Sequence, residues 1–151
     1  MSQDDPRRQE EWSALADRIL TIAREIAFRG YADERAVRLS QSEAMVMRFL
    51  QDEPTSTPSH IAQSTGLQRT NMSAVLRGLE SKGLIERRPG GADGRAVEVV
   101  LTTRGRQNYK LVRREWGTTI AEAVGADTAN LKPGLALLAQ IETGLTRQRR
   151  S

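Results

Sequence analysis

The spacing of glycines and apolar residues between positions 57 and 83 constrains the fold of this chain more than any other feature. Thr57 and Pro58 are typical of a helix N-cap and first turn, and Gly66 is placed to end that helix. A second helix is predicted over residues 68–82, because its apolar residues recur at the i, i+3, i+4, i+7 spacing of one helical face. These residues are Met72, Val75, Leu76 and Leu79. A short helix, a glycine turn and a second helix predict a helix-turn-helix.

The other face of the 68–82 helix carries side chains suited to the edges of DNA bases. Arginine suits guanine, asparagine or glutamine suits adenine, and a small apolar group suits the thymine methyl. The candidate base contacts are Gln68, Arg69, Asn71, Ser73, Ala74 and Arg77. Thr70 and the neighbouring amides are candidate phosphate contacts, because a helix N-terminus favours negative charge. The alternative for the two arginines is an ordinary exposed helix face.

The segments around this unit predict the rest of the fold. After Gly83, the runs LIERR and AVEVVLT flank the polar, glycine-rich PGGADGR, which is typical of a β-hairpin. Ser40 and Glu43 form a capping box that opens a helix, and residues 51–56 are expected to be a connection. Apolar stripes predict long helices over residues 9–28, up to about 124 after an N-cap at Thr103, and from about 131 onward. The predicted class is mainly α with a small β-hairpin wing, in a single domain spanning 1–151.

The stretch 39–105 resembles the MarR family of winged-helix transcription regulators. The resemblance rests on the order and spacing of short motifs: Ile61-Ala62, Gly66-Leu67, LESKGLI at 79–85, Asp93-x-Arg95, and Leu101-Thr102 followed by Gly105. Ala74 stands where many members carry a larger polar or basic residue. The resemblance implies a winged helix-turn-helix at 39–105 that binds DNA, flanked by N- and C-terminal dimerisation helices at 9–30 and 106–147. A monomer whose terminal helices fold back on the chain is the alternative.

Such a homodimer would place two recognition helices in successive major grooves of double-stranded DNA, about one helical turn or ~10 bp apart, so that the operator is an inverted repeat. In the wing, Arg95 would enter or approach the minor groove, and Asp93 would orient its guanidinium by a charge-assisted hydrogen bond. Arg88, at the base of the hairpin, would contact the DNA backbone. A turn that holds a solvated pair of Asp93 and Arg95 is the alternative.

The resemblance also implies an effector pocket between the dimerisation helices and the winged helix. There a small aromatic or phenolic acid would favour a spacing of the recognition helices unsuited to DNA. The candidate lining residues lie near the junction of the first two predicted helices: Phe28, Tyr31, Arg35, Arg38 and Phe49. An orphan regulator without a ligand is the alternative.

Composition narrows the function classes further. Lys and Arg number 23 against 19 Asp and Glu, and all but three of the 23 are arginines, whose planar fork suits phosphate and guanine. The base composition of the genome is an equally good explanation for the arginines outside residues 69–95.

The absence of cysteine excludes disulfides and thiolate metal sites, and one histidine with scattered carboxylates predicts neither metal nor cofactor. Apolar runs too short for a membrane span and an N-terminus unlike a signal peptide predict a cytoplasmic protein.

The function predicted is therefore a sequence-specific transcription regulator, which in this family is usually a repressor. The alternative is a winged-helix module that recognises another protein. An enzyme is not expected, because the chain has no nucleophile elbow, no phosphate-binding glycine loop and no paired acid and base at a useful spacing.

Overall fold

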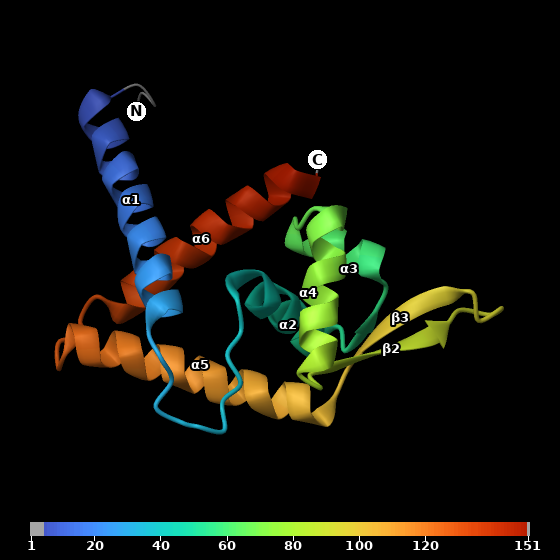
Figure 1. Ribbon diagram of the computed structural model, residues 1–151. Helices are drawn as coiled ribbons and strands as arrows, with labels where there is room; N and C mark the ends of the chain where they lie inside the picture. The colour runs from blue at the N-terminus through green and yellow to red at the C-terminus, as the bar shows by residue number, and fades with distance from the viewer. Residues whose placement is uncertain (1–4, 151) are drawn as a thin grey trace.

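The computed structural model describes residues 5–150, which form six helices and one three-stranded antiparallel sheet (Figure 1). The elements in order are α1 (Pro6–Phe28), α2 (Gln41–Asp52), β1 (Thr55–Ser56), α3 (Pro58–Thr65), α4 (Arg69–Ser81), β2 (Ile85–Gly90), β3 (Ala96–Leu101), α5 (Thr103–Val124) and α6 (Leu131–Arg150). The strands lie in the order β1-β3-β2. The predicted class, mainly α with a β-hairpin wing, is confirmed.

Local capping interactions set the helix boundaries where the sequence predicted them. The Ser40 hydroxyl accepts from the Glu43 N–H at 3.2 Å, and the Glu43 carboxylate accepts from the Ser40 N–H at 2.8 Å. The Thr57 hydroxyl accepts from the His60 N–H at 3.2 Å, with Pro58 in the first turn of α3. Gly66 then ends α3 in the left-handed conformation, at a φ of 74°. Each capping hydroxyl accepts a hydrogen bond from a backbone N–H that has no partner within the first turn of its helix.

Two local predictions were wrong, and both errors come from contacts distant in sequence. The N-cap of α5 is Thr102 and not Thr103, because the Thr102 hydroxyl donates to the Gly83 carbonyl at 2.8 Å and accepts from the Gly105 N–H at 2.9 Å. The expected connection at 51–56 contains β1, in which Thr55 pairs with Val100 of β3. A strand of two residues is too short to show an alternation of apolar and polar residues in the sequence, and only its pairing with β3 reveals it.

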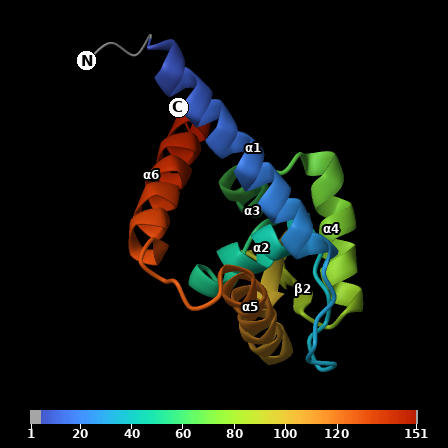
Figure 2. The same ribbon diagram turned by 90° about the vertical axis from the view of Figure 1, so that its left-hand side faces the viewer.

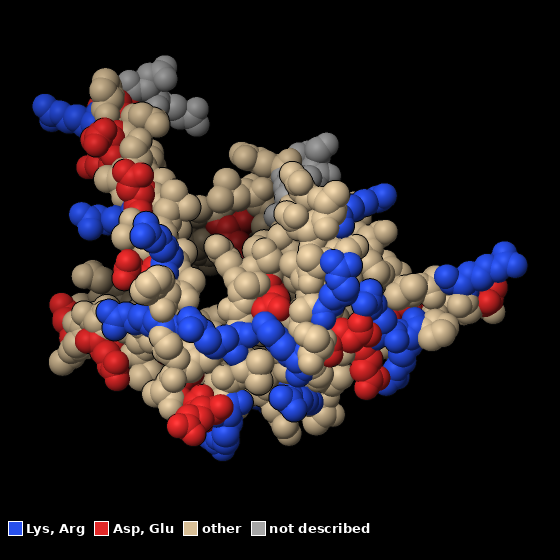
Figure 3. All heavy atoms as spheres, viewed as in Figure 1, with Lys and Arg blue, Asp and Glu red and all other residues tan. Residues whose placement is uncertain are grey.

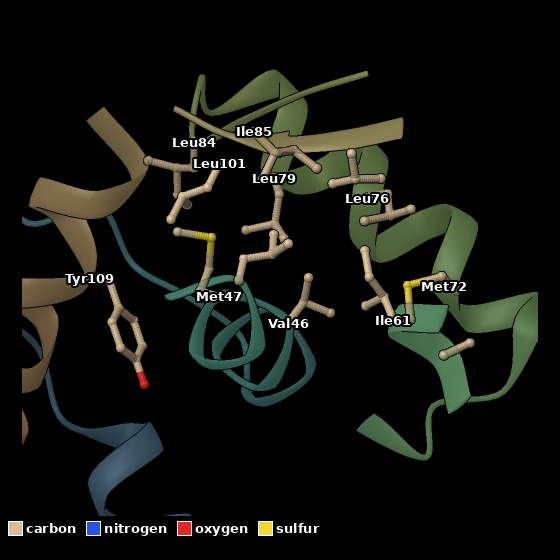
Figure 4. Close-up of a cluster of buried hydrophobic side chains, with 13 residues drawn as sticks. Val46, Met47, Ile61, Met72, Leu76, Leu79, Leu84, Ile85, Leu101 and Tyr109 are labelled. Atoms are coloured by element: carbon tan, nitrogen blue, oxygen red, sulfur yellow. The ribbon is translucent and has the colours of Figure 1, made fainter. Parts of the chain in front are cut away.

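The hydrophobic core lies where α2, α3 and α4 pack on the sheet and on the first half of α5 (Figure 4). Its side chains are 0–7% exposed: Val46, Met47, Leu50, Ile61, Ala62, Met72, Leu76, Leu79, Leu84, Ile85, Val99, Leu101 and Tyr109. Tyr109 contributes its ring edge-on to Trp116, with ring centroids 6.5 Å apart. Burial raises the pKa of the Tyr109 hydroxyl above its ordinary value. This core holds α4 and the hairpin as one unit.

The terminal helices extend away from that unit. Figure 1 shows α1 and α6 on the side of the molecule away from the wing, with their upper ends apart, whereas in Figure 2 these upper ends overlap. Every residue of α1 is exposed or half-buried, as is every residue of α6 from 131 to 148. A salt bridge of 2.8 Å between Arg48 and Glu142 joins α6 to α2. The apolar stripes predicted for these helices are present, and much of their surface faces solvent.

Candidate nucleic-acid interface

The recognition helix α4 buries one face in the core and presents the other to solvent. Met72, Leu76 and Leu79 are at most 3% exposed, as their spacing predicted. The exposed row contains all the side chains predicted to meet DNA here: Gln68, Arg69, Thr70, Asn71, Ser73, Ala74 and Arg77. A helix that is anchored by its buried face can present such a row in a rigid arrangement.

Both ends of α4 are defined by the backbone. Gln68 is the N-cap residue but makes no side-chain capping bond, so its side chain belongs to the exposed row. The first amides of α4 lack carbonyl partners one turn earlier, as at any helix start. At the other end Gly83 has a φ of 71°, and the Leu84 N–H donates to the Leu79 carbonyl at 3.0 Å. This turn fixes the direction in which β2 leaves α4.

The hairpin tip differs in one detail from the prediction. The Asp93 carboxylate accepts a hydrogen bond of 3.1 Å from the backbone N–H of Arg95, which shapes the turn between Gly91 and Gly94. The nearest side-chain contact, from Arg95 Nε to Asp93 Oδ2, is 3.8 Å, too long for the predicted hydrogen bond to the guanidinium. Arg95 is 89% exposed. The tip therefore leaves this guanidinium accessible to an external anion.

The base of the hairpin carries two arginines with different partners. Arg88 donates to Glu86 at 2.5 Å, in a pair that is more than half exposed. Arg87 donates to Glu80 of α4 at 2.6 Å, and its guanidinium lowers the pKa of that carboxyl below its ordinary value. Arg88 was the predicted DNA contact, whereas the role of Arg87 in tying the wing to α4 was missed. The alternation of side chains along β2 is the signal that distinguishes them.

Positive charge gathers on the face that includes α4 and the wing. Figure 3 shows Lys and Arg side chains over α4 and out to the tip of the hairpin, with a few acidic groups between them. The same view shows cations over the α1–α2 loop as well, and the whole chain carries a formal net charge of +4. A local concentration of cations of this kind is the electrostatic footprint expected of a DNA-binding surface.

The five predicted effector residues are not gathered in one pocket. Phe28, at the end of α1, is 84% exposed. The Arg38 guanidinium lies over the Tyr31 ring, 5.9 Å from its centroid. Arg35 is paired with Asp33 at 2.7 Å and lowers the pKa of that carboxyl to about 2 through its hydrogen bonds. Phe49 lies against His60 of α3, with ring centroids 5.6 Å apart, and so belongs to the edge of the core.

A cavity of about 340 Å³ lies beside α1, with Phe28 in its lining. The other lining residues are Leu20, Ala23, Arg24, Ala27 and Gln41. Figure 3 shows the molecule hollowed between α1 and the winged helix. Arg24 supplies a cation to an otherwise mainly apolar wall. Sequence reasoning missed Arg24, although residues 20, 24 and 28 share one face of a helix.

Between residues 5 and 150, none of the helices combines the length and the apolar character that a membrane span requires. Among the same residues no group of three or more His, Cys, Asp or Glu side chains is arranged to hold a metal ion.

The sequence comparisons agree with this geometry. The profile of the MarR family matches residues 39–96, which run from the start of α2 to the start of β3. An HTH-type transcriptional regulator of Mycobacterium leprae is 31% identical over 107 residues, which cover 69% of this chain and 72% of that protein. The region matched by the family profile contains α2, α3 and α4, which supply most of the buried core.

Solved structures share the fold over nearly the whole chain. A MarR family protein from Bacillus stearothermophilus superposes with a TM-score of 0.69 at 16% identity, covering 94% of this chain and 98% of that one. The Bordetella bronchiseptica regulator BpsR, whose DNA binding is regulated by 6-hydroxynicotinic acid, superposes with a TM-score of 0.62 at 17% identity, covering 85% and 98%.

The exposed row on α4, the wing and these matches define a winged-helix transcription regulator. The chain belongs to the MarR family. Members of this family are DNA-binding regulators and not enzymes, and some of them respond to small ligands.

Proposed function

We propose that this protein is a sequence-specific repressor that binds an inverted-repeat operator as a homodimer and is released by a small aromatic or phenolic acid. The observation that carries the proposal is the face of α4, where polar side chains form an exposed row above a fully buried apolar row. Gln68, Arg69, Asn71, Ser73, Ala74 and Arg77 would read base edges, and Thr70 would meet a phosphate. Arg88, Arg95 and Asp93 would form the wing contact. A regulator that acts on the chromosome would be cytoplasmic.

Exposed apolar side chains support the homodimer. All but two of the large exposed apolar residues lie on α1, on α6 or at the end of α5. They are Trp12, Leu20, Ile22, Phe28, Ile120, Val124, Leu131, Leu135, Leu138 and Leu145. Large exposed apolar side chains concentrated on a few helices are typical of a protein interface, and two-fold closure is the commonest oligomer symmetry. The dimerisation part would comprise residues 9–30 and 106–147.

The experiment that tests DNA recognition is selection of binding sites from randomised duplexes at about 0.15 M salt, which screens loose electrostatic binding. We expect an inverted repeat with half-sites about one helical turn apart. Asn71→Ala should relax base preference at one position of each half-site. Arg95→Ala should weaken all sequences alike and reduce the slope of log Kd against log salt by about one per subunit. Arg8→Ala, which removes a charge from the first turn of α1 outside the proposed dimerisation part, is the matched control.

Failure to enrich any sequence would favour the alternative, a winged-helix module that recognises a protein.

The homodimer is tested separately by sedimentation of a Leu135→Glu/Leu138→Glu variant. We expect a monomer with operator affinity at least about 100-fold weaker, because two linked half-sites bind far more tightly than one. Ala126→Glu/Ala129→Glu adds the same charge in and beside the α5–α6 turn and should remain dimeric. A dimeric Leu135→Glu/Leu138→Glu variant would contradict the proposed interface.

The effector site would include the cavity beside α1. Its apolar wall suits an aromatic ring, and Arg24 suits a carboxylate. We expect 6-hydroxynicotinic acid or a related phenolic acid to weaken operator binding, and Arg24→Ala to abolish that response without changing operator affinity in the absence of acid. An unchanged operator affinity at every acid concentration would favour an orphan regulator without a ligand. The other residues predicted to line the effector pocket are Tyr31, Arg35, Arg38 and Phe49. Alanine substitutions of these residues provide the comparison for Arg24→Ala.

A further inference from the structure

Lys82, at the C-terminal end of the recognition helix, joins that helix to α2 and to the α1–α2 loop. Lys82 is the C-cap residue of α4, and its ammonium group donates to the Glu43 carboxylate at 2.6 Å and to the Arg38 carbonyl at 3.0 Å. Its side chain is 32% exposed and that of Glu43 only 8%. The ammonium therefore lies between α4, the start of α2 and the loop that joins α1 to α2.

One oxygen of the Glu43 carboxylate, Oε2, accepts two hydrogen bonds at this point. The oxygen that accepts from Lys82 also accepts from the Ser40 N–H, at the N-cap of α2. A carboxylate so little exposed needs a charged partner, because an unpaired buried charge is strongly unfavourable. Removing the ammonium of Lys82 would force this carboxylate to move or to find another donor. The pair therefore fixes the position of α4 relative to α2.

Gly78 makes room for the same carboxylate. A Cβ atom at position 78 would lie 2.6 Å from Oε1 of Glu43, so the carboxylate at the end of that side chain would have to shift. Glycine inside a helix is unfavourable relative to alanine, so its presence in the middle of α4 has a cost. The close approach of Glu43 to the α4 backbone accounts for it.

The contacts continue from Lys82 to the end of α1. Arg38, whose carbonyl accepts from Lys82, donates through its guanidinium to the carbonyls of Ala27 and Arg29, each at 3.3 Å. Those carbonyls belong to the last turn and the C-cap of α1. Figure 2 shows the α1–α2 loop running down beside the lower end of α4. One chain of polar contacts thus links α1 to the recognition helix.

The α1–α2 loop is also held against α5. The Asn108 side chain is buried, accepts from the Val37 N–H at 2.7 Å and donates to the Val37 carbonyl at 3.0 Å. Glu115 of α5 accepts from the Ala32 N–H at 2.7 Å. A loop anchored at both points transmits a displacement of α1 instead of absorbing it.

We propose that Lys82 is a positioning residue for DNA recognition: it fixes the C-terminal end of α4 to Glu43 and to the α1–α2 loop, so that the position of α1 sets the orientation of the recognition helix. The inference rests on the proposed function, in which α4 reads the operator. Lys82 acts through α4 and makes no DNA contact of its own.

The first test replaces Lys82 with Met, which keeps the aliphatic stem and removes the ammonium. We expect operator affinity to fall about tenfold, with the salt slope and the affinity for non-specific DNA unchanged, and Lys82→Arg to restore much of the loss. Arg8→Met, which removes an exposed cation from the first turn of α1, outside the proposed dimerisation and DNA-binding parts, is the control. A salt slope reduced by about one per subunit, with an equal loss on non-specific DNA, would show a phosphate contact instead. An unchanged operator affinity would equally overturn the proposal.

The second test is Gly78→Ala, which separates positioning from stability. Alanine is the better helix former, so a purely structural view expects a protein at least as stable that binds DNA normally. Displacement of the Glu43 carboxylate predicts weaker operator binding, by about tenfold, without a lower melting temperature. The control is Gly117→Ala in α5, where a Cβ meets nothing within 4 Å among residues 5–150, provided that sedimentation shows it to be as dimeric as wild type. Normal operator affinity in Gly78→Ala would contradict the proposal.

Amide hydrogen exchange distinguishes failure of this inference from failure of the proposed function. If the wild-type protein selects no operator, the proposed function fails and the attachment of α4 is still measurable. Lys82→Met should then speed exchange in the last two turns of α4 and leave α3 unchanged. Equal exchange in Lys82→Met and wild type would show that Lys82 does not hold the helix.

Discussion

The winged helix and the terminal helices differ in how their apolar residues are covered. In the winged helix Val46, Leu50 and Leu79 are 0% exposed, and they cover one another within the chain. On the terminal helices Leu20 is 70% and Leu145 63% exposed, although both regions have equally regular apolar stripes. The difference teaches that the same periodicity serves two purposes. One stripe builds an internal core, and the other leaves a surface that a second chain can cover.

The largest expected effect contrasts Leu76→Ala with Leu20→Ala. Leu76 is 2% exposed in the core, so its truncation should lower the free energy of unfolding by about 2–5 kcal/mol. Truncation of Leu20 should change it by no more than about 0.5 kcal/mol while the chain is monomeric. Urea unfolding across a range of protein concentrations measures both. Equal losses at the lowest concentration would remove the distinction between the two regions.

An intermediate effect contrasts two glycines of α5, which begins in the winged helix and ends among the terminal helices. A Cβ at Gly105 would lie 2.1 Å from the Leu84 carbonyl oxygen, so Gly105→Ala should cost about 1–3 kcal/mol through the shift it forces. The added Cβ of Gly117→Ala meets nothing within 4 Å in the described part of the chain and should stabilise the monomer by about 0.5–1 kcal/mol.

Thermal unfolding of both glycine variants, at a concentration that keeps the chain monomeric, measures the difference. A Gly105→Ala variant as stable as wild type would show that the junction of β2 and α5 can relax. A loss of association in Gly117→Ala alone would place this part of α5 inside the interface.

The smallest expected effect lies in the α1–α2 loop, between the two regions. Hydrogen bonds from Arg35 lower the pKa of Asp33 to about 2, from an ordinary value of 3.8. Because the folded-state pKa is the lower one, this group stabilises the fold above about pH 4 and loses that contribution as the pH falls toward 2. Asp33→Asn should remove this part of the pH dependence. Urea midpoints between pH 2 and 5, compared with Asp127→Asn, measure it, and parallel curves would contradict the assignment.

The elements predicted well are those whose signals lie close together in sequence. The buried row of α4 followed from the spacing of Met72, Leu76 and Leu79, and the end of α3 followed from Gly66. In each case the interactions join residues within one or two helical turns. The resemblance to MarR regulators rested on such short motifs, and the family was confirmed.

The errors concern contacts between distant segments. β1 exists because Thr55 meets Val100, and Thr102 caps α5 because Gly83 is placed beside it. Phe49 was expected beside Phe28 but packs against His60, since the face of α2 that carries it turns toward α3. The predicted contacts of α4 and the wing with DNA stay predictions, as do the dimer and its effector.

The sequence by itself determined the helix-turn-helix, its caps and its family, because apolar spacing, capping hydroxyls and glycine turns act over a few residues. Only the tertiary structure decided which apolar stripes are covered within the chain and which are left open, because coverage depends on elements far apart in sequence. It also decided the contact of Lys82 with Glu43 and Arg38. Those three residues lie in segments that only the packing of α4 against α2 and the α1–α2 loop brings together.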